Sequence, residues 1–213
     1  MLNNILVIGA NGKVGRLIIK DLVDRGKRVR GMVRSPDQVK EIERSGAEAF
    51  IGDLEKEFTR AFEGMECVIF TAGSGSHTGP DKTVLVDQQG AIKSIDISGD
   101  YDIKRYIMVS ALGAKNPELR SNIRHYYKAK RKADDYLTDS GLEYTIFRPG
   151  RLTDEEGTGK IKVSGQLTVK RTTRRADLAL AIAESVDLTQ TVNKIIEILD
   201  GEDDVADALS SIT

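Results

Sequence analysis

The stretch that decides the fold is "ILVIGANGKVGRLIIKDLVDRG", residues 5–26. It begins with a continuous apolar run, passes through three glycines at three-residue spacing, and continues with apolar residues at helical spacing. A continuous apolar run is typical of a strand that is buried on both faces, as in a parallel sheet. Val14, Leu17, Ile18 and Leu22 share one face of a helix. The stretch therefore predicts a buried strand, a tight glycine turn and an amphipathic helix.

The same alternation of strand and helix recurs along the chain. Runs rich in Val and Ile predict strands at residues 4–9, 28–33, 47–52, 67–72, 105–110 and 144–149. Later in the chain the pattern predicts a helix at 175–186, a strand at 193–201 and a short helix at 203–212. Repeated strand–helix units indicate the α/β class, with a Rossmann-type doubly wound parallel sheet and helices on both faces. We expect one domain over residues 1–213, in which the Gly-rich, least regular segment 151–171 is a small elaboration on the substrate side.

The composition excludes several classes of function. The chain of 213 residues carries 32 basic and 33 acidic side chains, so no general field attracts nucleic acid or an anionic membrane surface. Its apolar runs are far shorter than a membrane span, and the chain enters a strand at once without a leader, which predicts a cytoplasmic protein. Cys67 is expected to be a buried filler, and His77 and His125 lack metal spacing, so no metal site is predicted. The expected partner is a small-molecule substrate, and a monomer is favoured.

The glycine turn indicates a dinucleotide site. Gly9, Gly12 and Gly15 follow the first strand and precede the first helix. At such a place glycines allow a tight turn, a close approach of the backbone to a pyrophosphate and close helix packing, while the helix N-terminus offers free N–H groups. The turn therefore predicts binding of a nicotinamide dinucleotide.

The end of the second strand favours NADP over NAD. An NAD-selective site usually has an acidic residue there, which accepts a hydrogen bond from the ribose 2′-hydroxyl. This chain has Arg34 followed by Ser35. A guanidinium is a planar, permanently charged partner for phosphate, so these two residues are expected to bind a 2′-phosphate.

The motifs together resemble the short-chain dehydrogenase/reductases. The similarity is to the atypical, compact NAD(P)-binding members related to sugar epimerase-like and flavin-reductase-like proteins, whose glycine spacing is that of this chain. It extends over almost the whole sequence and rests on "GANGKVG" (9–15), "VR" (33–34), "GDL" (52–54), "TAG" (71–73), "VSALG" (109–113), "YYKAK" (126–130), "SGLEYTIFRPG" (140–150) and "RRADLA" (174–179).

The resemblance implies a set of cofactor-binding residues. Asp53 would contact the adenine with help from the next backbone amide, residues 71–73 would line the adenosine side, and the backbone at 149–150 would pass beside the nicotinamide. The expected cofactor contacts are Gly9, Asn11, Gly12, Lys13, Val14, Gly15, Arg34, Ser35, Asp53, Leu54, Thr71, Ala72, Gly73, Lys130, Pro149 and Gly150.

The resemblance also implies a catalytic set of Ser110, Tyr126 and Lys130. Residues four apart on a helix stand on one face, so the Lys130 ammonium is expected near the Tyr126 phenol, where it would lower the phenol pKa from its ordinary value near ~10. Tyr126 would give a proton to a carbonyl oxygen that Ser110 holds, and Lys130 would bond the nicotinamide ribose. Tyr127 is the competitor, but the residue four positions after it is an arginine. Many members of the family have an Asn on the helix after the fourth strand, where it completes a proton relay. In this chain Asp87 or Gln88 is expected in that region.

Three functions remain open at this stage. The leading prediction is an NADPH-dependent oxidoreductase that acts on a small carbonyl, quinone or flavin-like acceptor. The second is an epimerase or dehydratase that uses the same Tyr and Lys, although only about sixty residues follow Gly150, which leaves little room for a large substrate lobe. The third is a non-catalytic sensor that binds NADP and acts through a protein partner.

Overall fold

The computed structural model describes residues 1–75, 78–119, 123–163 and 172–213 of the chain. Its strands are β1 (Asn4–Ile8), β2 (Arg28–Val33), β3 (Glu48–Ile51), β4 (Cys67–Phe70), β5 (Arg105–Val109), β6 (Tyr144–Pro149), β7 (Arg151–Thr153), β8 (Lys160–Val163), β9 (Thr172–Arg174), β10 (Lys194–Asp200) and β11 (Asp203–Asp204). The strands expected at 28–33 and 144–149 are found with those bounds. The strands expected at 4–9, 47–52, 67–72 and 105–110 are also found, but each ends one or two residues before its expected end.

Seven α-helices and several short helical turns connect these strands in the described ranges. The α-helices are α1 (Lys13–Asp24), α2 (Val39–Arg44), α3 (Pro80–Lys82), α4 (Ala91–Asp100), α5 (Arg124–Asp139), α6 (Arg175–Ser185) and α7 (Val205–Ser210). The 3₁₀ turns are η1 (Pro36–Gln38), η2 (Thr59–Phe62), η4 (Leu112–Lys115), η5 (Pro117–Leu119) and η7 (Thr189–Thr191), and η3 (Thr83–Gly90) is a π-helix. None of the helices in these ranges has the length and hydropathy needed to cross a membrane.

The strands form a nine-stranded sheet in the order β11-β8-β10-β6-β5-β4-β1-β2-β3. The seven strands from β10 to β3 run parallel, which confirms the doubly wound parallel sheet, while β8 and β11 add an antiparallel edge. The expectation of an irregular segment at 151–171 was wrong for β7 and β8. These are short strands beside Gly-rich loops, and β8 gains its hydrogen bonds from β10, which lies far along the chain.

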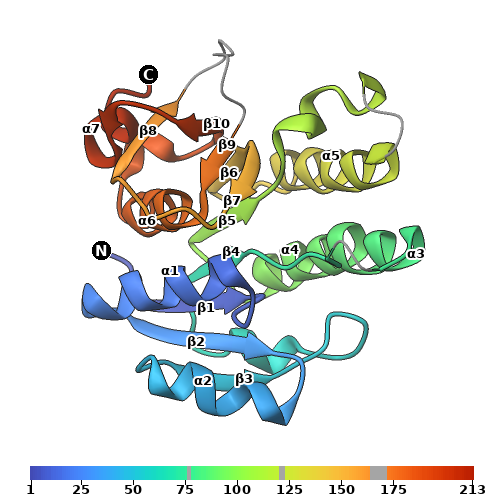
Figure 1. Ribbon diagram of the computed structural model, residues 1–213. Coiled ribbons are helices and arrows are strands. Elements are labelled where there is room, and N and C mark those ends of the chain that lie inside the picture. The colour runs from blue at the N-terminus through green and yellow to red at the C-terminus, as the bar shows by residue number, and fades with distance from the viewer. Residues whose placement is uncertain (76–77, 120–122, 164–171) are drawn as a thin grey trace.

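The two faces of the sheet are covered by different helices (Figure 1). Alternate residues of β1 point to opposite faces, so Ile5 and Val7 join one core cluster with α1 and α6, whereas Leu6 and Ile8 join another with α4 and α5. Chain order reverses between β1 and β4, which lie side by side. In open α/β sheets the ligand crevice lies at the carboxyl ends of the strands at such a reversal. The fold therefore directs attention to the residues after β1, β4 and β5.

Candidate active site

The loop after β1 is built so closely that it requires glycine. Gly9 has a φ of +89°, and a Cβ there would lie 2.6 Å from the backbone nitrogen of Ala72. A Cβ at Gly15 would overlap the carbonyl oxygen of Gly9, and the Gly12 N–H donates to that same oxygen at 3.0 Å. Helix α1 follows with Gly12 as its N-cap and no side-chain cap, so its first N–H groups face outward. This cradle fits a pyrophosphate.

The other residues of the glycine loop have partners within the protein. Asn11 Oδ1 accepts a hydrogen bond of 2.6 Å from Arg16, and the Val14 side chain packs into the core. Lys13 Nζ lies 2.5 Å from an oxygen of Asp154, which follows β7. The hydrogen bond from Lys13 holds the pKa of Asp154 below its ordinary value, with Arg175 contributing. Asp154 was missed by the sequence reasoning because the segment that carries it shows no pattern.

Arg34 lies directly after β2, as expected. Its side chain is exposed, and its backbone N–H donates to Gln38 Oε1 at 3.0 Å. No ion pair joins Arg34 to an acid within the described ranges. Ser35 is half-buried beside it, at the start of η1. The guanidinium thus remains available to an anionic ligand.

The residues after β3 form a local turn. Asp53 Oδ1 accepts from the backbone N–H of Glu55 at 3.0 Å, and the Leu54 side chain packs against Gly90. One carboxylate oxygen of Asp53 is therefore used to shape the turn. Its predicted contact with the adenine stays a prediction.

The segment after β4 lies directly beside the glycine loop. The Thr71 N–H donates to the Ile8 carbonyl at 2.9 Å, and the Thr71 hydroxyl donates to the Gly9 carbonyl at 3.4 Å. Gly73 leaves room for the carboxylate of Asp87, which a Cβ would approach to 3.1 Å. Two segments that the sequence predicted separately as cofactor contacts are thus adjacent in space.

At the other end of the expected cofactor site, the backbone after β6 is tied to its neighbours. Pro149 pairs in register with Ile198 of β10. The Gly150 N–H donates to the Thr173 hydroxyl at 3.0 Å and to the Ile198 carbonyl at 3.3 Å. The course of the chain at 149–150 is therefore fixed by the sheet.

Helix α5 brings Lys130 to the ends of β4 and β5. The Lys130 ammonium is almost fully buried, lies 3.0 Å from Asp87 Oδ1, and donates to the carbonyls of Val109 at 3.3 Å and Ala72 at 3.5 Å. The Tyr126 ring lies one turn earlier, with its centroid 5.8 Å from Lys130 Nζ. Of the two candidates for the position after β4, Asp87 therefore contacts the lysine.

Tyr127 has a different environment from Tyr126. Its ring lies flat against Gly113 of η4, where a Cβ would overlap the ring. Because this contact fixes the loop after β5, Tyr127 packs against the scaffold, while Tyr126 is the tyrosine beside the lysine. The structure thus brings Tyr126 and Lys130 together as the spacing predicted.

The direction of the Tyr126 pKa differs from the expectation. Burial raises it, the Lys130 charge opposes burial, and the Asp87 carboxylate raises it further, so that the net pKa is above the ordinary value. For Lys130, burial lowers the pKa, but the attraction of Asp87 and Tyr126 outweighs burial and raises it. The expected lowering of the Tyr126 pKa was wrong because burial outweighs the effect of the Lys130 charge, and the Asp87 carboxylate adds to the rise.

Ser110 lies at the end of β5 in a second buried network. Its hydroxyl donates to Asp134 Oδ2 at 2.9 Å, and Arg148 of β6 donates to the same oxygen at 2.9 Å. Burial raises the pKa of Asp134, while Arg148 and Ser110 oppose the rise. Asp134 was not singled out from the sequence, although it stands four residues after Lys130 on the same helix face. The Ser110 hydroxyl has one proton and gives it to Asp134, so in this arrangement it does not donate to a substrate oxygen. The role of Ser110 in holding that oxygen stays a prediction.

The remaining candidates for chemistry do not join this site. Cys67 is fully buried, and burial raises the pKa of its thiol to about 12. His125 is exposed on α5, and His77 lies outside the described residues. Within the described ranges, no cluster of His, Cys, Asp and Glu has the arrangement of a metal site.

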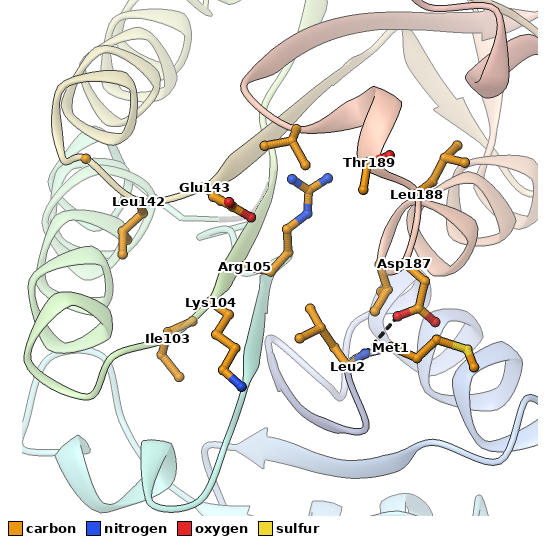
Figure 2. Close-up of a pocket in the computed structure, with 13 residues that line it drawn as sticks. Met1, Leu2, Ile103, Lys104, Arg105, Leu142, Glu143, Asp187, Leu188 and Thr189 are labelled. Carbon is orange, nitrogen blue, oxygen red and sulfur yellow. Dashed lines mark hydrogen bonds between the residues drawn. The ribbon is translucent and has the colours of Figure 1, made fainter.

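A groove of about 570 Å³ lies at the other end of the strands from the candidate site, at the amino ends of β5 and β6 (Figure 2). Arg105 lines it, but this guanidinium donates to the hydroxyls of Thr145 at 2.6 Å and Thr191 at 2.7 Å. Asp187 accepts from the Leu2 N–H at 2.8 Å, as Figure 2 shows. The charged groups of the groove thus serve to join the N-terminal strand, β5 and the segment after α6.

Known proteins resemble this chain over most of its length. Residues 9–188 match the family model for NAD(P)H-binding proteins. A solved structure from Bacillus halodurans, provisionally named an NAD-dependent epimerase/dehydratase, superposes with a TM-score of 0.95 at 44% identity and covers 97% of this chain and 98% of that one. An uncharacterized sugar epimerase of Bacillus subtilis, YhfK, is 40% identical over 98% of this chain and 99% of its own length. Sanguinarine reductase of Eschscholzia californica is 28% identical over 92% of this chain and 88% of its own length.

These findings define the class. The chain belongs to the NAD(P)H-binding family of atypical short-chain dehydrogenase/reductases. Its relatives include reductases and epimerases, so it is an NAD(P)-dependent enzyme of the oxidoreductase or epimerase type that uses a nicotinamide cofactor. Location in the cytoplasm and the monomeric state stay predictions.

Proposed function

We propose that the protein is an NADP(H)-dependent oxidoreductase that transfers a hydride to a small carbonyl, quinone or flavin-like acceptor. The observation that carries the proposal is the position of Lys130, whose ammonium donates to the carbonyls at the ends of β4 and β5, beside the glycine loop and one turn from Tyr126. A proton donor, a cation and a pyrophosphate cradle therefore meet at one end of the sheet.

The residues present fit the cofactor. Gly9, Gly12 and Gly15 form a cradle that any Cβ would narrow, at the N-terminus of α1. Arg34 and Ser35 would hold the 2′-phosphate, because Arg34 is exposed and no acid in the described ranges pairs with it. This supports NADP over NAD.

The chain contributes proton transfer and orientation. A bound reduced nicotinamide would supply the hydride. Tyr126 would give the phenolic proton to the acceptor oxygen, and its pKa, which burial raises, keeps it protonated at neutral pH. Lys130 would bond the nicotinamide ribose from its place between Ala72 and Val109. Ser110 can accept a hydrogen bond from a substrate, since its own proton goes to Asp134.

The test is consumption of NADPH and of NADH by the purified protein with a panel of aldehydes, quinones and flavins. We expect turnover with at least one acceptor, and a lower KM for NADPH than for NADH. Tight binding of NADPH without turnover on any acceptor would favour the sensor function, and absence of NADPH binding would contradict the proposal.

A second candidate is epimerisation of a sugar derivative. Its support is the naming of two relatives, at 44% and 40% identity, as an epimerase/dehydratase and a sugar epimerase. Tyr126 and Lys130 would serve both reactions. The assay distinguishes them, because epimerisation consumes no net NADPH and instead converts a sugar nucleotide to its epimer, which chromatography of the products would detect.

A further inference from the structure

Asp87 occupies an unusual place in the fold. It lies in η3 (Thr83–Gly90), eight residues of π-helix between α3 and α4, and its side chain is completely buried. Stretches of π-helix are rare and are frequently found at functional sites. Asp87 Oδ2 accepts from the Ser74 backbone N–H at 2.9 Å, while Oδ1 faces Lys130 at 3.0 Å. One carboxylate thus joins the segment after β4 to helix α5.

The geometry leaves Lys130 little freedom. Its ammonium is confined between the Asp87 carboxylate and the carbonyls of Val109 and Ala72. Each of these partners is an acceptor fixed by the scaffold, since Asp87 is itself held by Ser74, Val109 ends β5, and Ala72 follows closely after the neighbouring β4. The lysine is therefore positioned before any ligand binds.

The charges that act on Tyr126 come from two elements. Lys130, Tyr127 and Asp134 lie on its own helix, and Asp87 faces it from η3. On the elements that pack against α5, Arg148 pairs with Asp134, Glu118 pairs with Lys128 and Arg124, Lys115 pairs with Glu197, and Asp96 accepts from Tyr136. Burial has the largest influence on the Tyr126 pKa, and among the charges Lys130 and Asp87 act most strongly.

We propose that Asp87 is a positioning residue that holds Lys130 and offsets its charge, so that Tyr126 keeps the proton that it gives up in reduction; this inference rests on the proposed function. In that direction a bound NADPH would give the acceptor carbon one hydride, which carries both electrons, and would itself be oxidised to NADP⁺. The O–H bond of Tyr126 breaks as its proton goes to the acceptor oxygen, and the phenolate regains a proton from water. The reverse reaction needs the phenolate as a base, which the Asp87 carboxylate disfavours.

The direct test is an NMR titration of protein labelled at Cζ of tyrosine, without cofactor or acceptor. Tyr126→Phe assigns the signal. In Asp87→Asn, whose amide oxygen can still accept from Ser74, the titration midpoint of Tyr126 is expected to move to lower pH, because a negative charge is lost and the Lys130 charge is uncovered. An unchanged or higher midpoint would overturn the inference. If Asp87→Asn does not fold, the smaller neutral variant Asp87→Ser tests the same point.

Two further variants test that the effect is local and that the Lys130 charge acts on Tyr126. Asp96→Asn removes a carboxylate beside Tyr136 and should lower the midpoint of that tyrosine while leaving Tyr126 unchanged. In Lys130→Met the titration midpoint of Tyr126 should move to higher pH, because the charge that opposes burial is lost. A midpoint that does not rise would overturn the role of Lys130.

The kinetic test separates this inference from the proposed function. For an acceptor that is turned over, Asp87→Asn should lower the pH at which kcat for reduction falls on the alkaline side. An alkaline limit that does not move would contradict the inference, whereas absence of turnover in the wild type would contradict the proposed function and leave the NMR result to decide on Asp87.

Discussion

Helix α5 takes part in two buried ion pairs that differ in the chemistry of their cations. Asp134 pairs with Arg148 of β6 and accepts from Ser110, while Lys130 pairs with Asp87 of η3 and lies beside Tyr126. A guanidinium cannot lose its proton in a protein, whereas a buried lysine can. The first pair is therefore suited to fixing the structure, and only in the second pair can the cation lose its charge.

The largest expected effect comes from breaking the arginine pair. Asp134→Ala leaves the buried Arg148 charge without a partner, so the free energy of unfolding should fall by about 3–5 kcal/mol, with little dependence on pH above the range in which the Asp134 carboxyl titrates. Urea denaturation at several pH values measures this. A loss below about 1 kcal/mol would show that the network is not a structural anchor.

Breaking the lysine pair should cost less and should depend on pH. In Asp87→Ala, burial without the carboxylate depresses the folded-state pKa of Lys130 below the unfolded value of about 10.4. The unfolded state then binds more protons between the two values, so stability relative to wild type should rise with pH in that window. Urea denaturation of both proteins over the same pH range is the measurement. A loss independent of pH would mean that Lys130 behaves like Arg148.

An exposed cation at the ligand site should affect binding rather than folding. Arg34→Ala removes a charge-assisted contact to the expected 2′-phosphate, worth about 1.5–3 kcal/mol, so the Kd for NADPH should rise roughly tenfold to hundredfold and that for NADH should change little. Fluorescence titration with both cofactors tests this. Equal losses for NADPH and NADH would contradict the assignment.

The smallest effect is expected at the exposed pair of Lys13 and Asp154, whose side chains are 68% and 59% exposed. Asp154→Asn should leave the free energy of unfolding almost unchanged, because exposed pairs are screened by water and salt. It should tighten NADPH binding at low salt, since Lys13 is freed beside the glycine loop. Weaker binding in the variant would indicate that Asp154 helps to shape the loop.

The fold was largely predictable because its signals are local. The apolar runs gave β2 and β6 with their observed bounds, and the glycines placed the turn before α1. Strands β8 and β11 were not predictable, because they are short and depend on antiparallel partners distant in the chain. Local periodicity carries no record of such pairing.

In the candidate site, the sequence predicted which side chains are neighbours better than it predicted their electrostatics. The spacing of Tyr126 and Lys130 identified neighbours on one helix face, and the structure places them together. The effect of Asp87 on the Tyr126 pKa and the bond from Ser110 to Asp134 depend on contacts between separate elements. The four-residue spacing that linked Tyr126 to Lys130 also leads to Asp134. Of the contacts that were missed, the position of Asp134 was therefore the one that the sequence could have indicated.

The measurement that tests the central claim most directly is kcat for NADPH oxidation by Tyr126→Phe, with the best acceptor from the panel. We predict a fall of about 10²–10⁴-fold, the usual contribution of a general acid, with the Kd for NADPH unchanged. Tyr127→Phe is the matched control and should retain most of the activity, because that ring packs against Gly113. A Tyr126→Phe protein that turns over at the wild-type rate would contradict the assignment of Tyr126 as the acid of this site.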